Sequence, residues 1–225
     1  MTTFIDWSAL WLTVKLGVFT VLILLLIAIP FSWWLSRYQG KAKPLIEATV
    51  ALPLVLPPTV LGFYLLLAFS PDTWFGAWYQ SLTGQQLAFS FEGILLASLI
   101  YSLPFVVQPI LTSFNQLGAK YDSAAASLGI PAYKRFLFLL LPMIKPALIS
   151  AATLGFAHTL GEFGLVLMIG GNIPGETQVL SIALYNQVET MNYQQAHRLA
   201  GVLLLFSFVS LTLLYKFNRK HIGFN

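Results

Sequence analysis

The sequence has few charged residues and contains no cysteine. Charged residues make up 9% of the 225 positions, whereas a soluble domain carries roughly 25%. So few charges cannot cover a globule in water, which excludes an ordinary soluble enzyme, and a disordered chain is excluded by the 57% of hydrophobic residues. Without cysteine there is no disulfide framework, thiolate metal site or cysteine nucleophile. The composition therefore predicts a polytopic membrane protein.

Several kinds of functional site are also missing. No Gly-x-x-x-x-Gly-Lys-Ser/Thr loop occurs, so energy from ATP must come from a partner chain. No cluster of histidine and acidic residues has metal-ligand spacing, and we expect no cofactor. The basic residues stand in small groups beside apolar runs, so we expect no nucleic acid partner. Only His158 and Glu162, four residues apart, could support a membrane-embedded enzyme, and we expect none.

Apolar runs define the fold class. A helix needs about 20 apolar residues to cross a bilayer, and five runs reach this length. A weaker stretch at 179–190 is too short alone and could add a sixth, short or re-entrant helix. The sequence predicts an all-α membrane protein with five clear transmembrane helices, possibly six, in a single domain over residues 1–225. The five predicted spans are about 10–35, 46–69, 93–114, 136–160 and 199–215.

The charges that are present orient the chain. Lysine and arginine gather in segments 36–44 and 116–135 and in the tail, whereas segments 70–92 and 161–198 carry acids, with Arg198 at the far end of the second. Basic short loops mark the cytoplasmic side. Five spans would therefore place the N-terminus outside and the C-terminus inside. The basic residues are Arg37, Lys41, Lys43, Lys120, Lys134, Arg135, Lys216, Arg219 and Lys220.

Three prolines interrupt the second span within Leu52–Pro58. Each proline removes a backbone hydrogen bond and kinks a helix, and such breaks survive in a bilayer only beside protein or a water-filled cavity. The element is either a static kink or part of a transport path. No lysine or arginine falls in the middle of a span, so we expect a weakly binding polar path. Its candidate residues are Pro57, Pro58, Thr59, Ser102, Thr159 and, at the outer mouth, Arg198, with Ser98, Gln108 and Thr153 as further polar groups.

The loop at 116–135 predicts a short helix outside the membrane. Asp122 can cap its N-terminus, three alanines favour helix, and Gly129 followed by Pro131 ends it after about two turns. An ordered helix of small residues suits a docking partner, although a plain connecting loop is the alternative. For Glu162 we expect a structural role, with backbone amides or His158 as its partner.

The run from Asp122 to Gly129, followed after nine residues by Leu139-Leu140-Leu141-Pro142, resembles the EAA loop of binding-protein-dependent ABC importer permeases. The sequence departs from that pattern by carrying aspartate where glutamate is commoner and Ile130 where a small residue often follows the glycine. The resemblance implies a type I ABC importer permease fold with a cytoplasmic coupling helix. It also implies that the ATP-binding subunit is contacted by Asp122, Ala124, Ala125 and Gly129.

The resemblance covers nearly the whole chain. The segment 52–67 resembles the second span of molybdate permeases, and segments 160–164 and 171–177 resemble both molybdate and sulfate permeases. The Pro-Pro-x-Val-x-Gly element favours molybdate, with sulfate, tungstate or, less, a non-ABC transporter as alternatives. The implied setting is the bacterial inner membrane. The implied partners are two ATP-binding subunits, a second copy of the chain, a periplasmic oxyanion-binding protein and membrane lipid.

Overall fold

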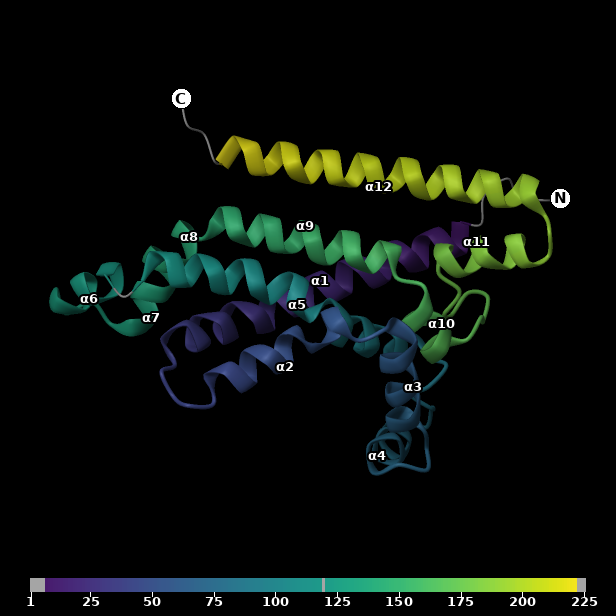
Figure 1. Cartoon of the computed structure of the whole chain (residues 1–225), viewed down its shortest axis with the longest axis horizontal. Coiled ribbons are helices and arrows are strands. Elements are labelled where there is room, and N and C mark those ends of the chain that lie inside the picture. Colours follow the sequence, from purple (N-terminus) through teal and green to yellow (C-terminus); the bar gives the residue numbers. More distant parts are fainter. Residues whose placement is uncertain (1–6, 119, 222–225) are drawn as a thin grey trace.

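The computed structural model describes residues 7–118 and 120–221, without the side chains of residues 214 and 217–221, and every regular element in this part is helical (Figure 1). Basic residues Arg219 and Lys220 thus lie outside the described side chains. The elements are α1 (Trp7–Arg37), α2 (Lys43–Val55), α3 (Pro58–Phe69), α4 (Trp74–Thr83), α5 (Phe91–Leu117), α6 (Lys120–Ser127), α7 (Ala132–Lys134), a π-helix (Arg135–Leu140), α8 (Leu141–Met143), α9 (Lys145–Gly161), α10 (Gly164–Gly170), α11 (Leu180–Glu189) and α12 (Tyr193–His221).

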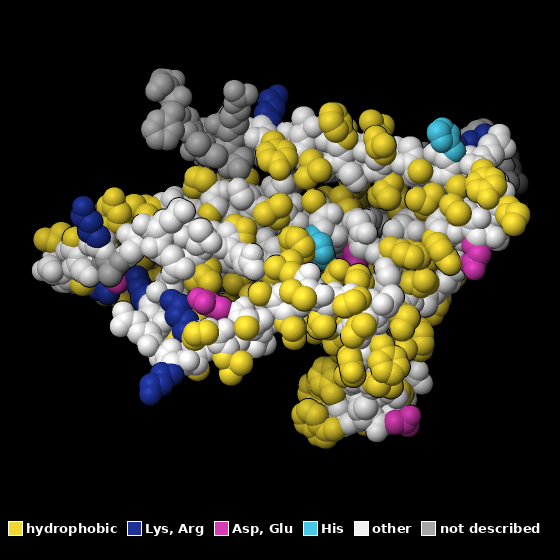
Figure 2. Space-filling view, viewed as in Figure 1, with side chains coloured by type: hydrophobic (Ala, Val, Ile, Leu, Met, Phe, Trp, Pro, Cys, Tyr) yellow, Lys and Arg dark blue, Asp and Glu magenta, His cyan; other side chains and the backbone are white. Residues whose placement is uncertain are grey.

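Four long helices run along the longest axis of the molecule. Helices α1, α5 and α9 pack against one another, and α12 lies along α9 (Figure 1). Helices α6 and α7 lie at one end, where lysine and arginine side chains gather (Figure 2). We call it the basic end. The chain segments that meet there, from the end of α1 to the start of α2 and from α7 to the π-helix, carry Arg37, Lys41, Lys43, Lys134 and Arg135. Helices α10 and α11 lie at the opposite end. Helices α3 and α4 form an arm that projects sideways from the bundle.

The described helices confirm the membrane prediction and refine its count. Helices α1 and α5 and residues Tyr193–Leu213 of α12 are each long and apolar enough to cross a bilayer. Two more spans result if each of two bent helix pairs counts as one, which gives the five that were predicted. Helix α11, with ten residues, is too short to cross. The last helix begins at Tyr193, earlier than the predicted 199.

The second predicted span is broken at its prolines. The chain bends by 110° between α2 and α3. Leu56 and Pro57 both precede a proline, which disfavours helical backbone, and both are extended, with ψ of 132° and 137°. Pro58 then begins α3, where its missing N–H costs nothing. The predicted kink is therefore a full break between α2 and α3 at Leu56 and Pro57, which we call the elbow.

The fourth predicted span is not the continuous helix that was expected from residue 136 to 160. Its first part, Ala132–Met143, is bent by 70° from α9, and the junction is Ile144. Prolines at 142 and 146 flank this residue and remove backbone donors on both sides of it. The preceding π-helix, which begins at Arg135, widens the helix just before the bend.

Close approach of small residues holds the bundle together. A Cβ atom placed on Gly17 would lie 2.8 Å from the Phe156 ring, and one on Gly155 would lie 2.7 Å from Val106 Cγ2. These contacts bring α1 and α5 directly against α9. Because lipid gives helices no hydrophobic drive to associate, small residues of this kind are typical of packed spans.

Candidate functional site: a charged end and a polar groove

An ion-pair cluster fixes α6 to the rest of the basic end. The Asp122 carboxylate accepts a hydrogen bond from Arg135 Nε at 2.8 Å and lies 3.0 Å from Nη2 of Arg37. The Asp122 side chain is 17% exposed, so water screens these contacts only partly. Arg135 also donates from Nη1 to the Ile130 carbonyl at 2.6 Å. One carboxylate thus ties together the end of α1, the helix α6 and the start of the π-helix.

The expected capping role of Asp122 is wrong. Helix α6 begins at Lys120, which places Asp122 inside the first turn, and its carboxylate is bound by the two arginines. The expected end of the helix is confirmed: Gly129 has φ of +74°, a conformation that favours glycine, and its N–H donates to the Ala126 carbonyl. Helix α6 has eight residues, about the two turns predicted.

The four predicted contact residues divide between two surfaces of α6. Ala124 and Gly129 are exposed, whereas Ala125 is buried and the Asp122 carboxylate is enclosed by its arginines. Exposed apolar side chains that were not predicted lie beside the first two. Tyr121, near the start of α6, and Leu128, directly after its last residue, are 44% and 79% exposed. Apolar side chains that project from a charged end indicate a protein-binding surface.

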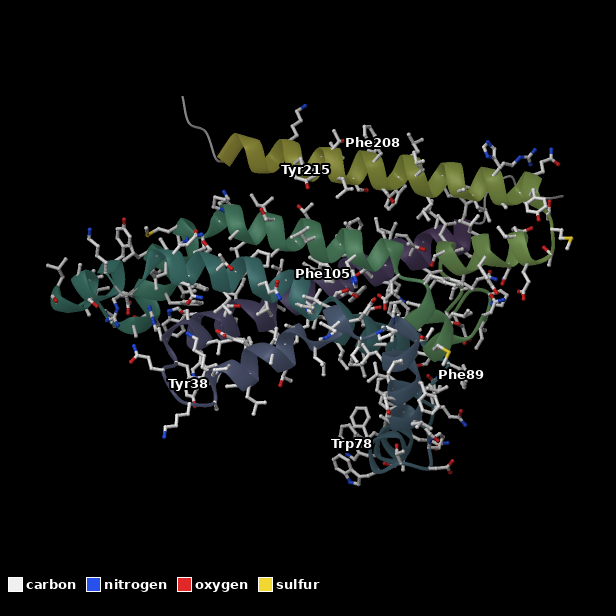
Figure 3. The ribbon with its side chains drawn as sticks, in the orientation of Figure 1. Tyr38, Trp78, Phe89, Phe105, Phe208 and Tyr215 are labelled. Carbon is white, nitrogen blue, oxygen red and sulfur yellow. The ribbon has the colours of Figure 1, made fainter. Side chains whose placement is uncertain are left out.

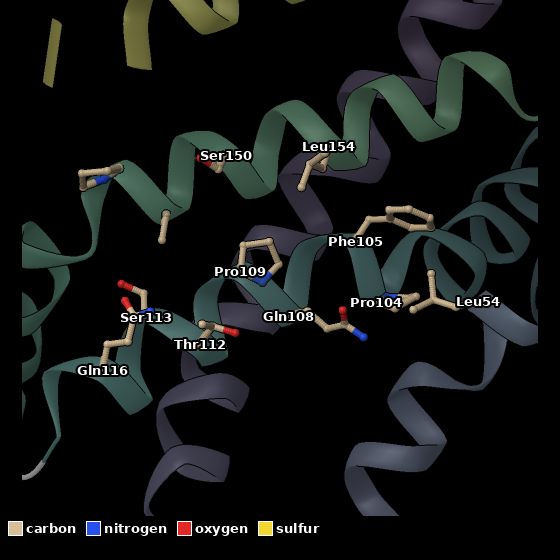
Figure 4. Close-up of a pocket in the computed structure, with 12 residues that line it drawn as sticks. Leu54, Pro104, Phe105, Gln108, Pro109, Thr112, Ser113, Gln116, Ser150 and Leu154 are labelled. Atoms are coloured by element: carbon tan, nitrogen blue, oxygen red, sulfur yellow. The ribbon is translucent and has the colours of Figure 1, made fainter. Parts of the chain in front are cut away.

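A groove runs between α5 and α9 toward the basic end (Figure 4). Its volume is about 560 Å³. Gln108, Thr112 and Gln116 follow one another at intervals of four residues along α5 and are exposed, so they form one polar stripe on that helix. We call the whole groove, which includes this stripe and the lining residues that follow, the polar groove. The other lining residues are Leu54, Pro104, Phe105, Pro109, Ser113, Pro146, Ala147, Ser150 and Leu154.

The polar groove contains hydrogen-bonding groups but no charged side chain. Seven of its twelve lining residues are apolar, and the other five carry an amide or a hydroxyl group. Because those polar groups would lose hydrogen bonds to water if they faced hydrocarbon, the polar stripe suits contact with water better than contact with lipid. Uncharged donors can bind an oxyanion weakly and release it, whereas fixed positive charge would hold it more tightly. The sequence had indicated Gln108 but missed Thr112, Gln116 and Ser150, although the four-residue spacing on α5 was a usable signal.

A buried polar cluster lies behind one end of the groove. Phe105, which lines the groove and is labelled in Figure 3, stacks on the His158 ring with centroids 4.0 Å apart. The Ser102 hydroxyl lies 2.9 Å from His158 Nδ1 and 3.2 Å from Thr159 Oγ1. Ser102 and Thr159 are almost fully buried. The structure therefore places these two predicted path residues in the wall behind Phe105.

Glu162 ends α9 and is 4% exposed. Its Oε2 accepts a hydrogen bond from the Ser98 hydroxyl at 2.9 Å, and its backbone carbonyl accepts one from Ser181 at 2.9 Å. The expected partners of the carboxylate, His158 or backbone amides, are wrong, because its Oε2 is bound by the Ser98 hydroxyl. Oε1 has no hydrogen-bond partner within the described part of the chain. Glu162 thus joins α5, α9 and α11 where α9 is interrupted.

The remaining path candidates lie at the elbow and at the opposite end. A Cβ atom on Gly164 would lie 3.5 Å from Pro58 Cβ and 3.8 Å from Thr59 Cγ2, so the elbow between α2 and α3 packs on the break between α9 and α10. Pro57 and Thr59 are exposed there. Two interrupted helices therefore meet at their breaks, an arrangement that transporters use beside a substrate path. Arg198 is half-buried near the start of α12 and lies apart from the groove.

Comparison with known proteins assigns the family. Residues 17–223 match the family described as "Binding-protein-dependent transport system inner membrane component". The chain belongs to this family. It is 46% identical over 218 residues to "Molybdenum transport system permease protein ModB" of Azotobacter vinelandii, which covers 97% of this chain and 96% of the relative. It is 33% identical to "Sulfate transport system permease protein CysT" of Escherichia coli (strain K12), over 85% of this chain and 70% of the relative.

Solved structures agree on the fold of this family member. An alginate-importing bacterial ABC transporter matches with a TM-score of 0.76 and 16% identity, over 95% of this chain and 78% of the other. The MetNI methionine ABC transporter in an inward-facing form matches with a TM-score of 0.70 and 15% identity, over 96% and 94%. The type I ABC importer permease fold is thereby confirmed, and the chain is a multi-pass inner-membrane protein.

Proposed function

We propose that this chain is the permease subunit of a binding-protein-dependent ABC importer and that its substrate is molybdate. The observation that carries the proposal is the uncharged polar groove between α5 and α9, in a chain 46% identical along nearly its whole length to a molybdenum permease. Hydroxyl and amide groups along the groove offer donors to a tetrahedral oxyanion. A site without fixed positive charge binds such an anion weakly, which suits passage.

Two copies of the chain would enclose the path, because the groove is open along one side. The elbow residues Pro57, Pro58 and Thr59 then lie where interrupted helices can rearrange. Selectivity comes from an external oxyanion-binding protein, which delivers substrate to the end that carries α10 and α11. This orientation follows from the basic end, which positive residues assign to the cytoplasm. It places the C-terminus in the cytoplasm.

Energy is supplied by two ATP-binding subunits that dock on α6. Ala124, Gly129, Tyr121 and Leu128 offer them an exposed, largely apolar surface. The Asp122 carboxylate acts behind this surface, because its two arginines connect α6 rigidly to α1 and to the π-helix. Movement of the ATP-binding subunits is thereby transmitted to the spans rather than absorbed by a loose loop.

The test is uptake of labelled molybdate by cells that express the chain with its ATP-binding and substrate-binding partners. We expect saturable uptake that excess unlabelled molybdate abolishes and excess sulfate leaves nearly unchanged. Sulfate is the competing substrate because of the sulfate permease relatives. Sulfate uptake that molybdate fails to inhibit would overturn the assignment, and failure of any ATP-binding subunit to co-purify would overturn the ABC mechanism.

A further inference from the structure

A second groove lies on the far side of α9 from the polar groove. It has a volume of about 330 Å³, and all its lining side chains but Ser210 are apolar. Ala152 and Phe156 line it from α9, two residues on from Ser150 and Leu154 of the polar groove. Two residues turn an α-helix by more than half a circle, so the two grooves use opposite faces of α9. We call it the apolar groove; its other lining residues are Val18, Val21, Leu22, Ser210 and Leu213.

The apolar groove exists because α12 packs loosely. Only 11% of the membrane-crossing part of α12 is buried, compared with 44% for α1 and for α5. Leu213, which lines the groove from α12, is 50% exposed. An apolar cavity of this kind does not hold water. In a bilayer, hydrocarbon is the solvent that reaches it.

Two lysines stand on the same helices, nearer the basic end. Lys145 is seven residues before Ala152 on α9, which is two turns and therefore the same face. Lys216 is three residues after Leu213 on α12, less than one turn away. Both side chains are exposed, and neither belongs to the ion pairs of the described residues. Both lysines therefore lie within about two helical turns of the groove, on its side toward the basic end.

We infer that the apolar groove binds one anionic phospholipid, with an acyl chain between α1, α9 and α12 and its phosphate near Lys145 and Lys216. The dimensions agree. Eleven residues separate Lys145 from Phe156, about 16 Å along a helix, and one leaflet of the hydrocarbon core is about 15 Å thick. A chain attached to a phosphate at the lysines therefore reaches the aromatic ring. Basic residues beside spans on the cytoplasmic side select anionic headgroups.

The experiment is native mass spectrometry of the assembled transporter, purified in mild detergent after reconstitution with equal amounts of phosphatidylglycerol and phosphatidylcholine. The wild type should retain phosphatidylglycerol preferentially. Lys145→Gln with Lys216→Gln should lower that retention about thirtyfold, since each lysine near the surface contributes a several-fold preference. Lys41→Gln with Lys43→Gln removes the same charge elsewhere at the basic end and should leave retention unchanged.

A second variant fills the groove without disturbing the core. Leu213→Trp places a large ring in the groove from the loosely packed helix and should displace the lipid while both lysines remain. Leu204→Trp, on a 71% exposed position of α12 outside the groove, is its control. Phosphatidylglycerol retention that survives the double lysine change or Leu213→Trp would overturn the inference. So would equal retention of the two lipids, or a change in subunit number in place of lipid loss.

Discussion

Charged side chains meet at the end of the molecule that carries α6, whereas the groove between α5 and α9 is lined by uncharged ones. At the basic end, one carboxylate binds two arginines within 3.0 Å. In the groove, Gln108, Thr112 and Gln116 are exposed and carry no charge. The ion pairs of the basic end have fixed geometry, which suits a connection that transmits movement between subunits. The uncharged groups of the groove can bind an anion only weakly, which suits a surface along which the anion must move.

The comparison teaches where the scarce charges of a membrane transporter are useful. Ion pairs outside the hydrocarbon hold their geometry without the large desolvation cost of burial in a membrane. Positive charge inside the path would stabilise bound substrate and slow its release, and negative charge would exclude it. Four substitutions follow in order of expected effect: the first two test this division, and the others test the buried contact of Glu162 and the charge of Arg198.

Gln108→Glu introduces a carboxylate of nearly the same shape into the polar groove. A negative charge repels another unit negative charge about 4 Å away by about 4 kcal/mol at the dielectric of a protein surface, and molybdate carries two such charges, so molybdate uptake should fall about 1,000-fold or more. Labelled-molybdate uptake measures the effect. Gln80→Glu makes the same change on exposed α4 and should leave uptake unaltered. Normal uptake by Gln108→Glu would remove the groove from the path.

Asp122→Ala removes the carboxylate that binds Arg37 and Arg135. Because hydrogen bonds to charged groups contribute about 1.5–3 kcal/mol, molybdate uptake should fall about tenfold. Uptake should fall more than ATP hydrolysis, since the ATP-binding subunits still dock on the outer face of α6. Asp122→Glu, which can still reach the arginines, should retain most activity. Glu47→Ala removes an acid of the α2 helix outside the cluster as a control. Equal losses in both activities would contradict a transmitting role.

Ser98→Ala should destabilise the transporter by about 1–3 kcal/mol, because it leaves both carboxyl oxygens of buried Glu162 without a side-chain partner. The measurement is the thermal unfolding temperature of the purified assembly. Ser207→Ala, on loosely packed α12, removes the same hydroxyl and should change this temperature little. An unchanged temperature for Ser98→Ala would show that the contact between α5 and the end of α9 is dispensable.

Arg198→Gln tests the prediction that Arg198 lies at the outer mouth of the path and attracts the anion there, and it should have the smallest effect. One partly exposed charge contributes at most about 1 kcal/mol, so uptake at low molybdate concentration should fall about threefold or less. Saturating molybdate should restore the rate, and Arg198→Lys should behave like the wild type. Identical concentration dependence for Arg198→Gln and wild type would eliminate the contact.

Local features of the structure were predictable because their causes are local. The elbow at Pro57 follows from prolines that forbid helical backbone before them, and the end of α6 follows from Gly129 and Pro131. The five predicted apolar runs correspond to the three spanning helices and the two bent helix pairs, because hydropathy is a property of contiguous residues. It missed α4 inside segment 70–92, where the Thr73 hydroxyl accepts a hydrogen bond from the Gly76 N–H and so starts a helix within an apparent loop.

The sequence by itself determined that this is a membrane permease of bent and continuous helices with a short helix outside the bilayer. Only the tertiary structure decided what the polar side chains face. The sequence indicated Ser102 and Thr159 for the path along with Gln108, yet packing of α5 on α9 buries Ser102 and Thr159 and leaves Gln108 exposed. The tertiary structure also decided the role of Asp122, which pairs with two arginines and does not cap α6. These arginines are 85 residues before it and 13 after it in sequence. Pairings over such distances depend on how helices pack, which spacing along one helix does not specify.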